Sequence, residues 1–431
     1  MPSPSPRRIL TALAFASAAM VLAGCTGAVP DSGSDSDSDG PLGVLLPAGT
    51  IADTIEPILD DFAKETGIEV ERTVLPTGDM RSRQVLELNS ESPELDVILL
   101  DDSWLAEVAH HLAPIDDLIE PEDVDGYVPG LTDAFKYDGQ QYGLPFIMSV
   151  RTIIYRTDLL EAAGFDRPPA TFEELEEYAA ALTTGDVYGF VGPWGSRSTY
   201  VNVWANLAYN AGLEAIVSED FSEATFANDA GVAAAELMGS LYANGSMPPD
   251  ALELDHEKVN RAMQEGRAAM TILPTVFFDH LNDPSVSPLA GNFGIAPLPQ
   301  GLDAESDRYI MTGFGWNLSK YSDNPEAAWE LIQYLNQRYL HPSEDLPRYQ
   351  LNSPASTSAF ENPGVQAIFG DYTSLVEEML GKATIRPQTT AWADIDNAIA
   401  DALQKVFLGE ADARTALEQA QQLSNVALAD Q

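Results

Sequence analysis

The sequence predicts an α/β protein with more than one domain. The chain has 431 residues and 45% apolar residues, which is an ordinary globular balance but too long for a single core. Near the start of its globular part, short apolar strands alternate with amphipathic helices over about 60 residues, a pattern typical of a parallel sheet covered on both faces. After Thr157 the pattern becomes mostly helical. These observations favour two unequal regions within residues 42 to 427.

The first region is predicted element by element. Ile55, Ile58, Leu59 and Phe62 recur at helical spacing, and Gly67 is placed to end that helix. The expected order is a strand at 43–46, this helix, a strand from 68–70, a helix containing Val85 and Leu88, and a strand at 96–100.

Turn and cap signals organise the rest. Asp138-Gly139 predicts a hairpin turn, and Thr171 with Glu174 forms a capping box at the start of a helix. Trp204 and Trp329 stand among apolar residues at helical spacing and are predicted to be core. We expect further helices at 200–210, 228–243, 258–265, 325–338, 372–380, 391–407 and 411–426, and strands at 268–273, 293–297 and 310–318.

The charge excludes one class of partner. With 22 Lys and Arg against 67 Asp and Glu, the formal charge is 22 − 67 = −45, and no basic stripe is present to bind nucleic acid. One cysteine and five histidines argue against a disulfide framework or a metal centre. We find no nucleophile elbow, zincin or P-loop motif, so we expect neither a catalytic residue nor a cofactor.

The N-terminus predicts export. Arg7 and Arg8 precede a 14-residue apolar run, Ile9–Leu22, which is too short to span a bilayer. The run leads into Leu22-Ala-Gly-Cys25, which resembles the lipobox of bacterial lipoproteins and implies that Cys25 is acylated. An ordinary secretory leader containing a cysteine is the alternative. We expect residues 1–24 to be the signal peptide and 25–41 a flexible stalk.

Rings and polar groups next to loops suggest a polyol site. Asp101 and Trp104 follow the apolar strand at its carboxyl end, where α/β sheets bind ligands. Aromatic faces stack on sugar rings, while Asp and Arg hold hydroxyl pairs. Other candidates are expected on exposed turns or near a guanidinium: Trp194, Phe314, Trp316, Arg386 and Trp392.

Several segments resemble extracellular solute-binding protein family 1 of ABC importers. They include DDFAKETGIE at 60–69, LDVILLDDSW at 95–104, YGLP at 142–145, EGRAAM at 265–270 and Arg386-Pro387, in the order of the family. The resemblance implies a two-lobe periplasmic-binding-protein-like (type II) fold. Its lobes would comprise 42–150 plus 293–340 and 151–292 plus 341–431, with crossings near 149–152, 292–296 and 338–343.

The resemblance also implies site residues. Asp101 matches the acidic residue after the strand, Gly313 and Gly315 match a glycine pair near the ligand, and Arg386 matches the arginine of the Arg-Pro motif. Ser149 and Arg151 fall on the hinge strand, and Trp392 stands where a tyrosine is usual. Relatives carry a tryptophan after the strand at 268–272, and we expect Phe277 or Phe278 to replace it.

The function implied is capture of a carbohydrate, such as a di- or oligosaccharide of the α-glucoside type. Hinge closure would deliver it to ABC permease subunits with a separate ATPase. The protein is expected to be a monomer held at the outer face of the cell membrane by lipid on Cys25. The alternatives are a polyamine or metal ligand on the same fold and, third, a surface glycosidase.

Overall fold

The protein is described here from a computed structural model that covers residues 40–302, 306–340 and 356–431. Cys25 and the expected signal peptide lie outside these residues, as does the stalk up to residue 39. Within the described ranges no helix combines the length and apolarity needed to cross a membrane.

The first sheet has the strand order β2-β1-β3-β12-β6. Strand β1 (Leu42–Pro47) pairs in parallel with β2 (Val70–Leu75) and β3 (Val97–Asp101), which confirms the parallel core predicted for this region. Strand β12 (Thr312–Leu318) runs antiparallel between β3 and β6 (Gly143–Ser149). Strand β12, which begins 312 − 101 = 211 residues after the end of β3, therefore completes the sheet.

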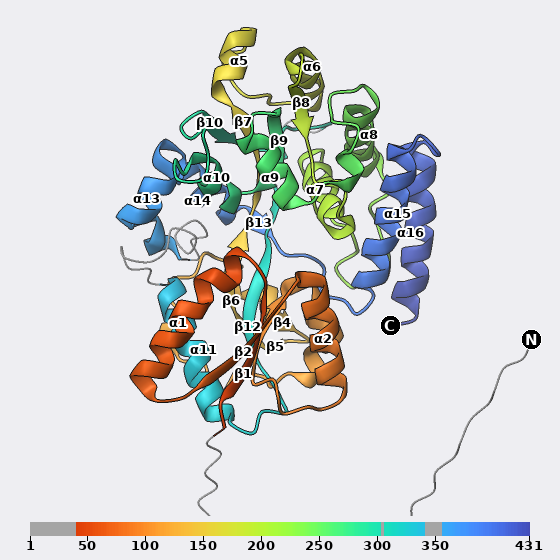
Figure 1. Cartoon of the computed structure of the whole chain (residues 1–431). Coiled ribbons are helices and arrows are strands. Elements are labelled where there is room, and N and C mark those ends of the chain that lie inside the picture. Colours follow the sequence, from red (N-terminus) through yellow and green to blue (C-terminus); the bar gives the residue numbers. More distant parts are fainter. Residues whose placement is uncertain (1–39, 303–305, 341–355) are drawn as a thin grey trace, which may run out of the picture. The chain divides into compact units, whose positions relative to one another are not determined.

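Helices cover both faces of this sheet. Helix α1 (Thr50–Thr66) buries Ile55, Leu59 and Phe62, and it ends at Gly67 with a left-handed φ of 80°, as predicted. Figure 1 shows α1 beside α11 (Pro325–Leu340), with α2 (Thr77–Asn89) on the opposite side of the strands. The apolar strands are consequently buried on both sides.

The second sheet has the order β10-β7-β9-β8. Strand β7 (Arg151–Arg156) pairs antiparallel with β9 (Ala268–Pro274) and β10 (Phe293–Ala296), while β8 (Tyr188–Val191) is parallel to β9. Residues from 293 onward are predicted from the sequence to belong to the first lobe. Strand β10 instead belongs to the second sheet, because its four residues are buried against β7.

The chain crosses between the sheets at two described places. Strand β6 leads into β7 through Val150 alone, which agrees with the crossing expected near residues 149–152. The return occurs after β10, where β11 (Tyr309–Ile310) pairs with β13 (Ala383–Thr384) before β12 enters the first sheet. This crossing lies later than the expected 292–296. Most of the third, expected near 338–343, is outside the described residues.

The predicted hairpin is present. Strands β4 (Lys136–Tyr137) and β5 (Gln140–Gln141) are joined by a turn at Asp138 and Gly139, and both residues have positive φ. The remaining helices follow the predicted pattern closely. Helix α6 is capped by Thr171, whose side chain accepts a bond from the Glu174 amide. Short helices lie at Leu105–Val108 (α3) and Pro121–Val124 (α4). The others are α5 (Thr157–Ala163), α6 (Phe172–Leu182), α7 (Arg197–Asn210), α8 (Asp229–Ala243), α9 (His256–Gln264), α10 (Val276–Asn282), α13 (Pro363–Phe369), α14 (Thr373–Gly381), α15 (Trp392–Phe407) and α16 (Ala413–Ala429).

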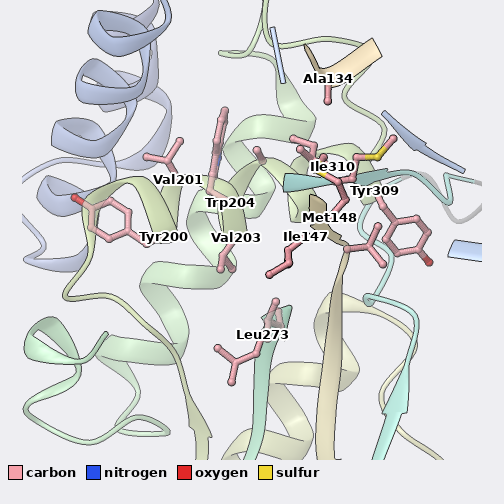
Figure 2. Packing of buried hydrophobic residues seen from close by; sticks show 14 of the residues in the cluster. Ala134, Ile147, Met148, Tyr200, Val201, Val203, Trp204, Leu273, Tyr309 and Ile310 are labelled. Atoms are coloured by element: carbon pink, nitrogen blue, oxygen red, sulfur yellow. The ribbon is translucent and has the colours of Figure 1, made fainter. Parts of the chain in front are cut away.

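One apolar core runs through both sheets. Trp204 of α7 is fully buried, and its indole N–H donates to the Gly231 carbonyl at 2.9 Å. Figure 2 shows Trp204 in the same packed cluster as Met148 of β6 and Leu273 of β9. Trp329 is also buried, so both tryptophans predicted as core are confirmed. The hinge strands are thus held in a packed apolar environment.

Candidate ligand-binding site

The site begins where β3 ends. Asp101 is the last residue of the strand, and a 3₁₀ turn (Asp102–Trp104) follows. The Asp101 Oδ1 accepts bonds from the Ser103 amide at 3.0 Å and the Ser103 hydroxyl at 2.6 Å, which caps the turn. The side chain of Asp101 stays 20% exposed, whereas that of Asp102 is fully buried.

Arg386 binds both carboxylates. Its guanidinium donates from Nε to Asp102 Oδ2 at 2.9 Å and from Nη2 to Asp102 Oδ1, and the same Nη2 reaches Asp101 Oδ1 at 2.5 Å. Burial opposes the charge, but the two carboxylates raise the pKa of Arg386 above its ordinary value. Two of the predicted site residues, Asp101 and Arg386, are therefore brought together as a partly buried ion pair.

The glycine pair of β12 supports this arrangement from the backbone. The Gly313 amide donates to Asp102 Oδ1 at 2.9 Å. A Cβ on Gly313 would lie 1.7 Å from the Ile147 carbonyl oxygen, and one on Gly315 would meet the ring of Phe135. Both positions therefore require glycine because neighbouring atoms leave no room. The amide of Gly313 is bonded to a carboxylate, and the close contacts at Gly313 and Gly315 give both glycines a packing role.

Arg151 lies at the start of β7 and is 3% exposed. Its Nη1 makes a long bond of 3.4 Å to Thr312 Oγ1, and its buried Nε has no partner among the described residues. Burial, followed by the positive charge of Arg386, lowers the pKa of Arg151 to about 9, which leaves it cationic at neutral pH. Ser149, two residues earlier, is buried at the register position opposite Thr312.

A histidine and a phenylalanine add a third group. The ring of Phe277 is partly exposed and stacks on His256 with 5.6 Å between centroids and 25° between planes. Burial, with Arg151 nearby, lowers the pKa of His256 to about 3, so this imidazole is neutral at physiological pH. Its buried Nε2 has no partner within the described residues. Phe278, the other candidate for the missing tryptophan, is instead buried against Phe369.

The predicted aromatic residues divide into two groups. Trp104 is partly exposed, with the Arg81 guanidinium 5.4 Å from its ring centroid, and Phe314 is also partly exposed at the register position opposite Asp101. Trp194 and Trp316 were expected on exposed turns, and this expectation is wrong. Trp194 is 2% exposed and packs between Phe190 and Phe407, Trp316 is fully buried against Phe146, and Trp392 is 5% exposed.

Four polar residues near these side chains were not predicted from the sequence. Asp102 was visible as the second half of an Asp-Asp pair, and Asp396 stands four residues after Trp392, on the same side of α15. Nothing in the sequence distinguished His256 or Arg81 from other surface residues. Their positions depend on which helices pack at the carboxyl end of β3.

The resulting arrangement suits a neutral, hydroxyl-rich ligand. It combines a part-exposed carboxylate (Asp101), a buried guanidinium with unused donor capacity (Arg151), a neutral imidazole (His256) and partly exposed rings (Trp104 and Phe277). Carboxylate and guanidinium groups bind paired hydroxyls, and aromatic faces cover apolar ring faces. The contributing residues come from elements of both sheets.

The class of protein follows from a family comparison. Residues 48–337 match the bacterial extracellular solute-binding protein family, so the chain belongs to that family. Its fold is the two-lobe α/β fold of binding proteins of this kind.

The relatives compared here have low sequence identity to this chain, but the matches cover nearly the whole length of both proteins. The maltooligosaccharide ABC transporter solute-binding lipoprotein of Streptococcus pneumoniae is 23% identical over 432 residues, covering 94% of this chain and 93% of the relative. Among solved structures, maltose-bound MalE3 of T. maritima has a TM-score of 0.81 at 21% identity, covering 90% of this chain and 99% of that one. A solute-binding protein of Agrobacterium radiobacter in complex with ribitol has a TM-score of 0.79 at 22% identity, covering 90% and 98%.

Proposed function

We propose that this protein is the lipid-anchored, extracytoplasmic binding component of an ABC importer. It captures a carbohydrate, most simply a di- or oligosaccharide such as an α-glucoside, and delivers it to permease subunits driven by a separate ATPase. It acts as a monomer and performs no chemistry on its ligand. The relatives compared above are themselves described as binding proteins of transporters.

One observation carries the proposal. Asp101 bonds to Arg386, and both influence the charge of Arg151 on a different sheet. Trp104 follows Asp101 by three residues, and Phe277 stacks on His256, whose pKa is lowered by burial and by Arg151. This mixture of charge, hydrogen-bonding capacity and aromatic surface is what a polyol requires. The names of the relatives support the same ligand class, since they include maltose, maltooligosaccharides and ribitol.

Capture by hinge closure is supported by the short connection between β6 and β7. Val150 is the one residue between these strands, so a change in its backbone angles would rotate one sheet against the other. Ser149 and Arg151 lie on either side of Val150, so their positions relative to each other would change as the hinge closes. Small-angle scattering with and without sugar tests closure, which predicts a smaller radius of gyration in the bound state.

Anchoring depends on Cys25. The lipobox-like sequence and the lipoprotein among the relatives support acylation of its thiol. A Cys25→Ser variant expressed in the native host is expected to move from the membrane fraction to the soluble extracytoplasmic fraction. Retention of this variant in the membrane would contradict the anchor.

Ligand class is tested by thermal unfolding with a panel of maltose, trehalose, maltotriose, galactobiose, ribitol, mannitol and spermidine. A true ligand stabilises by RT ln(1 + [L]/Kd), about 2.7 kcal/mol at a hundredfold excess over Kd. A shift with a saccharide and none with spermidine is expected. A shift with spermidine alone would replace the sugar by a polyamine, and release of reducing ends from glycosides would make the protein an enzyme.

A further inference from the structure

Asp396 on α15 is a half-buried residue, and one of its carboxylate oxygens is buried without explanation. Its Oδ1 is buried and has no hydrogen-bond partner in the described part of the chain, where every other carboxylate oxygen buried to this degree is bonded. Buried polar atoms in folded proteins are almost always paired, because an unpaired one loses its hydration without compensation. An unpaired carboxylate oxygen at this position therefore needs an explanation.

The neighbouring cations do not supply the missing partner. Arg386, Arg197 and Arg81 all lie close enough to influence the charge of Asp396, as does Asp101. Each of these arginines forms its ion pairs with carboxylates other than Asp396. Arg386 pairs with Asp101 and Asp102, Arg197 pairs with Asp401 at 2.5 Å, and Arg81 pairs with Glu107 at 2.8 Å. Asp396 thus lies near three positive charges, and none of them bonds to it within residues 40–302, 306–340 and 356–431.

Its position relates it to the proposed site. Asp396 follows Trp392 by one helical turn, and Arg386 and Asp101 form the bonded centre of the site. We propose that Asp396 is a ligand-binding residue whose carboxylate accepts hydroxyl hydrogen bonds from the captured sugar or polyol. This inference rests on the proposed function and adds a residue that defines specificity for paired hydroxyls.

The charge state gives the inference a pH signature. Burial raises the pKa of Asp396 to about 6, while Arg386, Arg197 and Arg81 lower it and Asp101 raises it. The ionised form accepts hydroxyl bonds more strongly than the protonated form. Affinity for a hydroxyl-bearing ligand is therefore expected to increase from pH 5 to pH 7.5.

The binding experiment compares Asp396→Asn with the wild type by calorimetry, using maltose and ribitol at pH 7.5 and pH 5. The variant is expected to bind at least tenfold more weakly at pH 7.5, with a smaller difference at pH 5. Asp394→Asn, an exposed position on the same helix, is the matched control and should bind within twofold of the wild type. Binding by Asp396→Asn within twofold of the wild type at pH 7.5 would overturn the inference.

A second measurement needs no ligand. Removing an unpaired buried charge is expected to leave the melting temperature of ligand-free protein at pH 7.5 equal or raised by about 2 °C. A decrease of several degrees would show that Asp396 is bonded within the fold and would overturn the inference. If neither maltose nor ribitol binds the wild type while this result holds, the failure falls on the sugar assignment rather than on Asp396.

Discussion

Two groups of polar side chains in this molecule differ in how completely they are hydrogen-bonded. The bonded cluster consists of Arg386, Asp101 and Asp102, whose hydrogen bonds join the end of β3 to the segment before α15. The incompletely bonded group consists of Arg151, His256 and Asp396, each with a buried nitrogen or oxygen that lacks a partner in the described residues. The bonded cluster joins two distant segments of the chain, whereas the incompletely bonded group has hydrogen-bonding capacity that the described residues do not use.

The hydrogen bonds of Arg386 and Asp101 bear on the ligand-binding roles predicted for these two residues. Arg386 uses Nε and Nη2 in three bonds to Asp101 and Asp102, and its role in ligand binding stays a prediction. All of the described bonds to Asp101 fall on Oδ1, so the second oxygen of this part-exposed side chain is left without a bond among the described residues. Unmade bonds lower stability, and natural proteins retain that loss mainly at functional sites.

The largest effect is expected from the bonded cluster. Asp102→Ala leaves the buried Arg386 with only the edge of Asp101, and breaking a buried pair in this way costs about 3–5 kcal/mol of unfolding free energy. Urea denaturation followed by tryptophan fluorescence measures the loss. Asp101→Asn, which keeps the Asp102 pair, should lose less than half as much. Equal losses would remove the distinction between the two carboxylates.

Arg151→Met tests the incompletely bonded group. The variant retains most of the side-chain volume and removes a buried cation with one long hydrogen bond, so the melting temperature should not fall. Affinity for the best saccharide of the panel should fall at least tenfold, about 1.4 kcal/mol. Arg156→Met on the same strand is the control, because Arg156 pairs with Asp158 at 2.6 Å. It should lower stability and spare affinity; the reverse pattern would exchange the two roles.

His256 predicts a pH effect of intermediate size. Its folded pKa of about 3 lies below the ordinary value of 6.5, so the unfolded chain binds a proton that the folded protein excludes. This stability is complete above pH 6.5 and declines as the pH falls toward 3, at a limiting rate of about 1.4 kcal/mol per pH unit. His256→Asn should flatten the stability profile between pH 6.5 and 4.5 while leaving pH 7.5 to 8.5 unchanged. Identical profiles would contradict a buried neutral imidazole.

The smallest effect is expected at Trp104. Replacing this partly exposed ring with alanine removes a stacking surface and the Arg81 contact, and should weaken saccharide binding by about 0.5–1 kcal/mol. Fluorescence titration with maltose measures it. Trp194→Phe serves as the control, because Trp194 lies in the core between Phe190 and Phe407 and its loss should not alter affinity. A larger binding defect at Trp194 would restore the role first expected for it.

Much of the fold could be predicted because local chemistry encodes it. The spacing of Ile55, Leu59 and Phe62 and the glycine at 67 determine α1, and the apolar run before Asp101 determines β3. The partner sheet of β10 could not be predicted, since an apolar strand of four residues fits either sheet equally well. The same limit applies to Trp194 and Trp316, whose glycine neighbours indicated turns but not the rings that cover them.

The sequence by itself predicted the α/β class and the family, which are both confirmed, and it predicted an export signal and ligand-binding roles for Asp101 and Arg386, which stay predictions. Only the tertiary structure decided that these two residues bond to each other, although they are 285 positions apart. It also decided that Arg151, His256 and Asp396 keep unpaired atoms beside them. The reason is physical: periodicity and composition record which face of an element is buried, whereas hydrogen-bond partners depend on which distant elements meet.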